Sequence, residues 1–197
     1  KKINFINSSS LEAQISSISD DIAYNNHDIQ DGLKANLFKL NDLIEINFFN
    51  EIYTSYKKFI NKNNNNILIY QIIRDSIDLM VKDLIKNTMQ NFKKNRIKNI
   101  QNVYSSASQI VCFSNKFKNI EKEIRLFLRK KMYNNKNVLI KNNNGEKIVK
   151  NLYSLISKKP NKFLNRKQLR EDKNRAISDF ISGMTDRYAI NLYKNTK

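Results

Sequence analysis

The sequence predicts an all-α protein built from several helices. Its 197 residues include only 3 glycines and 1 proline, too few for a fold that depends on hairpin turns or barrel corners. Apolar residues make up 40% of the chain and recur at the three- and four-residue steps that are typical of amphipathic helices. A chain of this length can bury a sizeable core, so one all-helical region over residues 1–197 is expected.

The first helix is expected over residues 10–31. Ser9 and Glu12 have the spacing of a capping box, which marks a helix start. No proline follows until well beyond this stretch, and Gly32 is a suitable C-cap.

Three more helices are expected in the middle of the chain. One covers residues 41–61 with Asn41 as its cap, and the loop "NKNNNN" separates it from the next helix. Another covers residues 114–134, with Ser114 as its cap. Between them a long helix over residues 68–95 is predicted from apolar residues at helical spacing: Ile73, Ile77, Met80, Val81 and Leu84.

The last third of the chain is expected to hold two helices and at most one strand. Residues 136–141 are the only stretch that alternates in a way compatible with a strand. A helix over residues 145–158 should follow the turn "KNNNG" and stop before Pro160. A final helix is expected over residues 170–194.

The composition excludes several classes of protein. No segment approaches the ~20 consecutive apolar residues of a membrane span, and the start "KKINFINSSS" lacks the apolar stretch of a signal peptide. The single cysteine, Cys112, cannot form an internal disulfide and lies in the apolar stretch "IVCF", so a buried, inert thiol is expected. These features predict a cytoplasmic protein without membrane partners.

Charge is distributed unevenly along the chain. Residues 1–56 carry 4 Lys or Arg against 8 Asp or Glu, whereas residues 57–197 carry 32 against 10. An acidic region beside a basic remainder suits a cation site next to a polyanion site, such as a metal with a phosphate-bearing ligand. The alternative is compositional drift toward lysine and asparagine, with the charges on solvated faces.

The first predicted helix carries a polar stripe. At 100° per residue from Asp20, Tyr24 lies at about 40° and Asp28 at about 80°, with His27 and Asp31 within about 20° of Asp20. Its opposite face is apolar and should be buried: Ile15, Ile18, Ile22, Ile29 and Leu33. The stripe faces either solvent or a cleft, and we expect a cleft because exposed like charges at i, i+4 spacing destabilise a helix.

His27 and Asp28 form a His-Asp doublet of the kind that holds a metal in some phosphohydrolases. Such a metal needs two further ligands, including another histidine. This chain has a single histidine, so we do not assign His27 as a metal ligand.

Four separated stretches resemble the bacterial dGTP triphosphohydrolase-like branch of the HD-domain phosphohydrolases. They are "LEAQISSISDDIAYNNHDIQDGLKANLF" (11–38), "MVKDLI" (80–85), "EIRLFLRKKMYNNKNV" (123–138) and "DFISGMTDRYA" (179–189). The stretches occur in the family's order and cover nearly the whole chain, but only the C-terminal half of the family. The resemblance implies the corresponding half of an HD-domain-like helical bundle.

The resemblance also implies roles for individual residues. Asp20 matches a metal-ligating aspartate, Tyr24 the tyrosine that packs on the deoxyribose, and Asp28 the carboxylate that contacts the 3′-hydroxyl. Asn135 stands where relatives often have histidine. Substrate contacts are further expected on one face of the helix at 114–134, where three residues follow at i, i+4 and i+8: Arg125, Arg129 and Tyr133.

The resemblance implies hydrolysis of a dNTP, with dGTP as the family's substrate, to a deoxynucleoside and triphosphate with a divalent metal such as Mg²⁺ or Mn²⁺. A homo-oligomer is also implied. The family's other metal ligands lie in its N-terminal half, so that missing half is an expected partner and this chain alone is expected to be inactive. The alternatives are a basic helical module that binds single-stranded nucleic acid, favoured by the charge of residues 57–197, and an inactive split-gene remnant.

Overall fold

A computed structural model describes residues 8–56, 65–165, 167–169 and 172–195. The described residues form helices and connecting segments without a strand, so the predicted all-α class is confirmed. The chain groups into two compact units, Lys1–Asn135 and Lys136–Lys197. The expectation of a single region over residues 1–197 stays a prediction.

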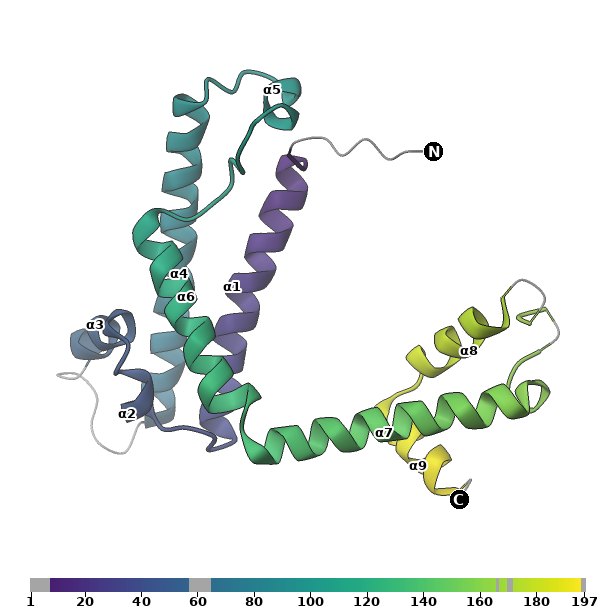
Figure 1. The fold of residues 1–197 in the computed structure, drawn as a ribbon. Helices are drawn as coiled ribbons and strands as arrows, with labels where there is room; N and C mark the ends of the chain where they lie inside the picture. The colour runs from purple at the N-terminus through teal and green to yellow at the C-terminus, as the bar shows by residue number, and fades with distance from the viewer. Residues whose placement is uncertain (1–7, 57–64, 166, 170–171, 196–197) are drawn as a thin grey trace. The chain divides into compact units, whose positions relative to one another are not determined.

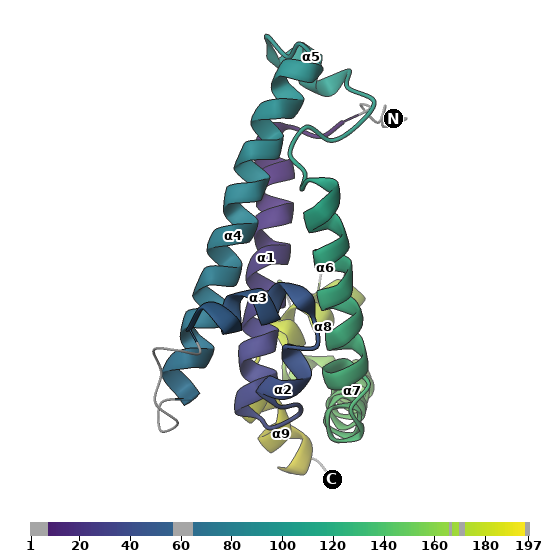
Figure 2. The same ribbon diagram turned by 90° about the vertical axis from the view of Figure 1, so that its left-hand side faces the viewer.

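Three long helices form the body of the first unit. They are α1 (Leu11–Lys34), α4 (Asn65–Lys94) and α6 (Asn115–Leu128), and α1 packs against both of the others (Figure 1, Figure 2). Helix α4 confirms the helix predicted over residues 68–95. The three helices share one apolar core, whose fully buried members include Ile29, Ile72, Met80, Ile124 and Leu128.

Helix α1 begins and ends at different residues from those predicted. Ser10, not Ser9, is its N-cap and accepts a hydrogen bond from the Ala13 amide at 3.3 Å. The helix continues past Gly32 to Lys34, so Gly32 is not the C-cap. Instead the chain reverses at Asn36, whose φ of 53° is left-handed. Gly32 is needed because the Phe38 ring packs directly against it.

The apolar face of α1 is buried for most of its length. Ile22 and Ile29 are buried and Ile18 is partly buried, as predicted. Ile15 is 50% exposed, so its predicted burial is wrong. At this end of α1 the inward position is taken by Gln14, whose side chain binds backbone instead of packing in the apolar core.

The single helix predicted over residues 41–61 is wrong in the described part of that range. Two short helices occupy it, α2 (Leu40–Leu43) and α3 (Asn47–Tyr56), and residues 57–64 lie outside the described residues. Lys39 rather than Asn41 is the N-cap of α2. On one continuous helix Leu43 and Phe49 would lie about 120° apart, yet both are fully buried. The break lets both side chains reach the core.

Helix α6 is fixed to its neighbours at its start. The Ser114 side chain caps the helix as predicted, accepting from the Phe117 amide at 3.5 Å. Asp83 of α4 accepts hydrogen bonds from the Ser114 amide at 2.9 Å and from its hydroxyl at 2.7 Å. Gln14 of α1 accepts from the amides of Ile110 and Val111 at 2.9 and 3.0 Å. These contacts set where α6 runs beside α1.

Side-chain amides of α4 hold the segment before α6. Asn91 donates to the Ile110 carbonyl at 2.9 Å, and Asn87 donates to the Cys112 carbonyl at 2.7 Å. The same two amides lie 3.3 and 3.5 Å from the Cys112 sulfur. Cys112 is therefore partly buried and hydrogen-bonded, rather than fully buried in apolar surroundings as predicted.

The helix predicted over residues 114–134 changes its winding. After Leu128 it continues as a π-helix, η1 (Arg129–Tyr133), in which the Asn134 amide donates to the Arg129 carbonyl at 3.0 Å. A further short helix, α5 (Ile100–Tyr104), was not predicted.

The second unit consists of α7 (Lys136–Lys158), η2 (Pro160–Lys162), α8 (Lys173–Ser182) and α9 (Asp186–Asn195) (Figure 1). The strand predicted at 136–141 and the turn at "KNNNG" are both wrong, because α7 is continuous through Gly145. A lone strand would leave its backbone groups unpaired, whereas a helix satisfies its own. Helix α7 ends before Pro160, as predicted.

The last predicted helix, over residues 170–194, is divided into α8 and α9 at Gly183–Thr185, and residues 170–171 lie outside the described range. Asp172 caps α8 by accepting from the amides of Asn174 and Arg175. The division lets α8 and α9 each pack on α7. The small core of this unit contains Ile156, Leu164 and Ile177.

Candidate functional site

A groove of about 600 Å³ lies between α1 and the helix formed by α6 and η1. Three elements line it. Helix α1 contributes Asp21, Tyr24 and Asn25, α6 contributes Lys122, Arg125 and Leu126, and the η1 region contributes Arg129, Tyr133 and Asn134. One wall therefore carries an acidic group and the other carries three cations. We call this site the α1–α6 groove.

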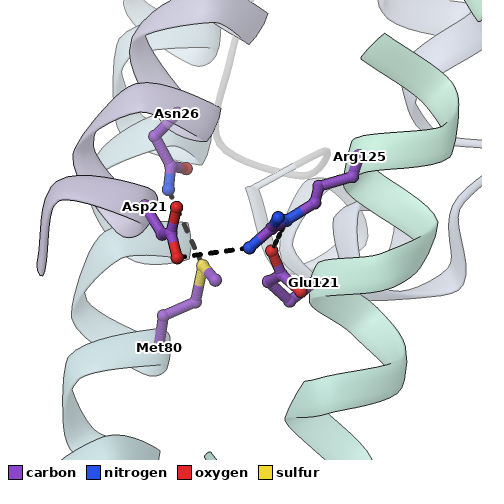
Figure 3. A network of polar contacts seen from close by, with 5 residues as sticks. All are labelled: Asp21, Asn26, Met80, Glu121 and Arg125. Carbon is purple, nitrogen blue, oxygen red and sulfur yellow. Dashed lines mark hydrogen bonds and ion pairs between the residues drawn. The ribbon is translucent and has the colours of Figure 1, made fainter. Parts of the chain in front are cut away.

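Two polar bridges join the walls of the groove. At one level the Arg125 Nη2 atom donates to the Asp21 Oδ2 atom at 3.2 Å. Arg125 also forms an ion pair through Nε with Glu121, one turn earlier on α6, and Figure 3 shows the guanidinium between the two carboxylates. At the other level the Tyr133 hydroxyl donates to the Asp28 carboxylate.

The bridges change the acidity of their members. Burial, followed by the hydrogen bond to Asp28, raises the pKa of Tyr133 to about 12, so this phenol stays protonated and acts as a donor at neutral pH. Burial lowers the pKa of Arg125, but the hydrogen bond to Glu121 and the charges of Glu121 and Asp21 raise it by more. The groove therefore holds a permanent cation next to a neutral hydroxyl donor.

The π-helix η1 brings Tyr133 to the groove. A π-turn inserts an extra residue and rotates the side chains that follow it, and such turns occur often at functional sites. On the outer side of η1, Lys131 Nζ lies 2.6 Å from Asp42 Oδ1 of α2. This ion pair, between side chains that are 32% and 29% exposed, ties η1 to α2.

The structure brings together most of the predicted site residues. Tyr24, Arg125, Arg129 and Tyr133 line one groove, but of the three stripe residues expected in a cleft, Asp20, Tyr24 and Asp28, only Tyr24 is a lining residue. Asp28 reaches the same groove through its hydrogen bond to Tyr133. Tyr24 remains 63% exposed.

Asp20 is exposed and does not line the groove, and His27 is also exposed. Sequence reasoning missed Asp21, Asn25, Glu121 and Lys122. The available signal was the i, i+4 spacing of Glu121 and Arg125, which favours an ion pair along a helix.

The described residues do not form a metal site by themselves. They contain no group of three or more His, Cys, Asp or Glu side chains placed to hold one ion. Asp20 could supply a single carboxylate, and one carboxylate holds a divalent cation only weakly. A metal at Asp20 would need ligands from another segment.

Two comparisons with known proteins bear on this site. Residues 111–195, which include the cationic wall, match the phosphohydrolase-associated domain family. Together with the helical fold, this match and the similarities below place the chain in a phosphohydrolase family.

The chain is also similar to proteins named deoxyguanosinetriphosphate triphosphohydrolase-like. The protein from Pelagibacter ubique (strain HTCC1062) is 69% identical over 193 residues, which is 98% of this chain and 52% of that protein. The protein from Leptospira interrogans (strain Fiocruz L1-130) is 34% identical over 195 residues, 96% of this chain and 51% of that protein. The protein from Rickettsia typhi is 33% identical over 190 residues, which is 93% of this chain and 50% of that protein.

The chain thus spans about half the length of the curated relatives it matches. The predicted resemblance is confirmed, and the chain corresponds to the C-terminal half of a dGTP triphosphohydrolase-like protein. Among the residues that the structure describes, no helix is long and apolar enough to cross a membrane.

Proposed function

We propose that this chain carries the substrate-binding wall of a metal-dependent dNTP triphosphohydrolase, with dGTP as the substrate. The observation that supports the proposal is the α1–α6 groove, in which Arg125 and Arg129 lie with Tyr24 and Tyr133. Guanidinium groups suit phosphate because they donate two parallel hydrogen bonds. An aromatic ring beside them suits the face of a sugar.

In this proposal the two ends of the groove take the two ends of the nucleotide. The polyphosphate lies along Arg125 and Arg129, the deoxyribose packs on Tyr24, and Asp28 accepts a hydrogen bond from the 3′-hydroxyl. Tyr133, which now donates to Asp28, would share that carboxylate with the sugar. Asp28→Asn is expected to weaken binding by about 1–3 kcal/mol, as for the loss of a hydrogen bond to a charged group.

Catalysis in this proposal depends on residues outside this chain. Asp20 would be one ligand of a Mg²⁺ or Mn²⁺ ion, and the remaining ligands would come from the half of the relatives that this chain does not share. When bound, the metal would supply an activated water for attack on the α-phosphorus. A cytoplasmic homo-oligomer is the expected form of the complete protein.

The test is to compare this chain alone with the chain plus the missing half supplied from the Pelagibacter ubique relative. This chain alone should release no triphosphate from dGTP in the presence of Mn²⁺. The mixture should release it, and Asp20→Ala should abolish the release while leaving dGTP binding in place. Metal-dependent release by this chain alone, lost in Asp20→Ala, would contradict the argument from ligand number.

A second candidate function, binding of single-stranded nucleic acid, is favoured by α7. This helix carries five lysines against one glutamate, and Lys136, Lys147 and Lys150 are exposed. Phosphate-backbone binding falls steeply with salt. Binding of an oligonucleotide that weakens with salt and is lost when these three lysines are changed to glutamine would support this function, whereas binding that survives the triple change would exclude α7.

A further inference from the structure

Helix α4 is apolar on two faces. One face is buried in the core of the first unit and includes Met80 and Leu84. The other face carries Val81, Ile85 and Met89, which follow at i, i+4 and i+8 and lie about 100°, 140° and 180° around the helix from Met80. Ile85 and Met89 are 59% and 57% exposed, and Val81 is exposed as well. We call Val81, Ile85 and Met89 the α4 stripe.

The α4 stripe leads into an apolar groove near the end of the helix. This groove has a volume of about 220 Å³, and Phe92, one turn beyond Met89, lies in its wall together with Leu11, Ile97 and Ile100. Ile100 is exposed. A helix that is apolar on both faces is normally buried on both, and a contiguous exposed apolar surface marks a contact site. The stripe and this groove therefore form a surface that lacks its partner.

The α4 stripe lies on the same side of the α1–α4 pair as Asp20, which is exposed. The two helices run antiparallel beside each other (Figure 1, Figure 2). At one end Lys34 Nζ lies 5.6 Å from the centroid of the Tyr70 ring, and at the other Glu12 lines the apolar groove with Phe92. Lys34 and Glu12 lie about 40° and 80° from Asp20 in the same direction around α1, while Tyr70 and Phe92 lie within about 60° of the middle of the stripe around α4. The outer side of α4 therefore flanks the face of α1 that carries Asp20.

We propose that the α4 stripe and the groove at its end are the docking surface for the half of the relatives that this chain does not share. This inference rests on the part of the proposed function in which that half supplies the remaining ligands of a metal at Asp20. The chain spans 52% of the Pelagibacter ubique relative, so the other half is of similar length. Neighbouring helix axes lie only about 8–10 Å apart, so a segment of that size that reaches Asp20 also covers α4. Its contact with the stripe is apolar, because a charge facing Ile85 would be desolvated without a partner.

The experiment compares the 197-residue chain with a full-length chimera in which this chain replaces the corresponding half of the Pelagibacter ubique relative, which is 69% identical to it there. Methionine oxidation by hydrogen peroxide, followed by mass spectrometry, reports on the stripe without any substitution. Met89 should be oxidised about tenfold or more slowly in the chimera than in the chain alone, whereas the fully buried Met80 should react slowly in both. Equal reactivity of Met89 in the two proteins would overturn the inference. Protection that appears only as the protein concentration rises would assign the stripe to a second copy and overturn it as well.

Ile85→Gln and Leu79→Gln form a matched pair, because each removes one apolar side chain from α4 without adding charge. Leu79 is 39% exposed and lies about 120° from Ile85 around the helix. Ile85→Gln should leave the melting temperature of the chain alone within about 2 °C of the unsubstituted value and lower that of the chimera by about 3–6 °C, since the side chain is buried only there. Leu79→Gln should shift both proteins by the same amount. An equal shift of both proteins by Ile85→Gln would overturn the inference.

Turnover by the chimera separates this inference from the proposed function. Met89 oxidation and the melting temperatures are measured without nucleotide or metal, so they do not depend on activity. If Met89 is protected in the chimera but the chimera with Mn²⁺ releases no triphosphate from dGTP, the docking surface stands and the proposed function fails. If the chimera releases triphosphate while Met89 stays as reactive as in the chain alone, the proposed function stands and the docking surface fails.

Discussion

Gly32→Ala is expected to destabilise the first unit, although alanine is the better helix former. A Cβ atom at position 32 would lie 2.2 Å from Phe38 Cε1 and 2.5 Å from Cζ, far inside the ~3.5–4.0 Å of a normal carbon contact. Phe38 is buried, and its ring packs edge-on against Phe127 of α6 with centroids 4.8 Å apart. The ring therefore cannot move away without disturbing α6.

The size of the effect follows from two opposing terms. Replacing a glycine inside a helix by alanine gains about 0.5–1 kcal/mol, whereas overpacking a core costs about 1–3 kcal/mol. A required shift of more than an ångström in a buried ring places the cost at the upper end, so the net loss should be about 1–2 kcal/mol. For a unit of this size that lowers the melting temperature by roughly 3–8 °C.

Gly145→Ala is the control, because it makes the same change in a helix without the contact. Gly145 lies inside α7, with nothing within 4 Å of an added Cβ. This change should stabilise the second unit by about 0.5–1 kcal/mol. Thermal unfolding followed by far-ultraviolet circular dichroism measures both variants. An unchanged or higher melting temperature for Gly32→Ala would refute the packing argument, and a lower one for Gly145→Ala would refute a continuous α7.

Three other predictions concern the contacts that build and tune the groove. Gln14→Leu should lower the unfolding free energy measured in urea by about 2–4 kcal/mol, because the amides of Ile110 and Val111 both lose their acceptor. A loss below about 1 kcal/mol would show that water replaces the Gln14 side chain as the acceptor. The pKa of Tyr133 is raised from 10.0 to about 12, so the neutral phenol contributes stability that is complete below pH 10 and is lost as the pH rises toward 12. The difference in unfolding free energy between the unsubstituted chain and Tyr133→Phe should therefore shrink over that range. A constant difference would contradict the bridge to Asp28. In a reconstituted enzyme Tyr24→Ala should narrow the preference for dGTP over GTP, since a ring packed on C2′ leaves no room for a hydroxyl, and an unchanged ratio of kcat/KM would remove Tyr24 from that role.

Local sequence signals predicted much of the fold but failed where distant packing decides. The Ser114 cap, the stop before Pro160 and the long helix α4 depend on neighbouring residues and were predicted correctly. The break between α2 and α3 accompanies the full burial of both Leu43 and Phe49 in one core. The "KNNNG" turn signal was outweighed because residues 136–141, if extended, would find no partner strand among the described residues, whereas in α7 they satisfy their own backbone hydrogen bonds.

For the groove, too, local sequence signals predicted some residues, and distant packing decided the rest. Helical spacing placed Tyr24 and Asp28 on one face of α1, and the resemblance supplied Arg125 and Tyr133. The predicted face centred on Asp20, whereas the observed wall is rotated toward Asp21 and Asn25, about 100° and 140° from Asp20 at 100° per residue. That rotation is set by where α6 lies, and Asp83 and Gln14 fix α6 through contacts distant in sequence.

If the groove binds a polyphosphate, as proposed, the bridges across it determine how readily the polyphosphate enters. Arg125 is already paired with Asp21 and Glu121, so a phosphate must displace these carboxylates to reach it. The side chains of Arg125 and Asp21 are 56% and 48% exposed, and ion pairs at such exposure contribute only about 0–1 kcal/mol. A bidentate phosphate can exchange for Asp21 at little cost, whereas displacing Glu121, whose side chain is only 17% exposed, should cost more. In the free protein both carboxylates hold the guanidinium on the groove wall. The Arg129 guanidinium lines the groove and has no such partner among the described residues, so Arg129 should bind phosphate first and Arg125 should follow.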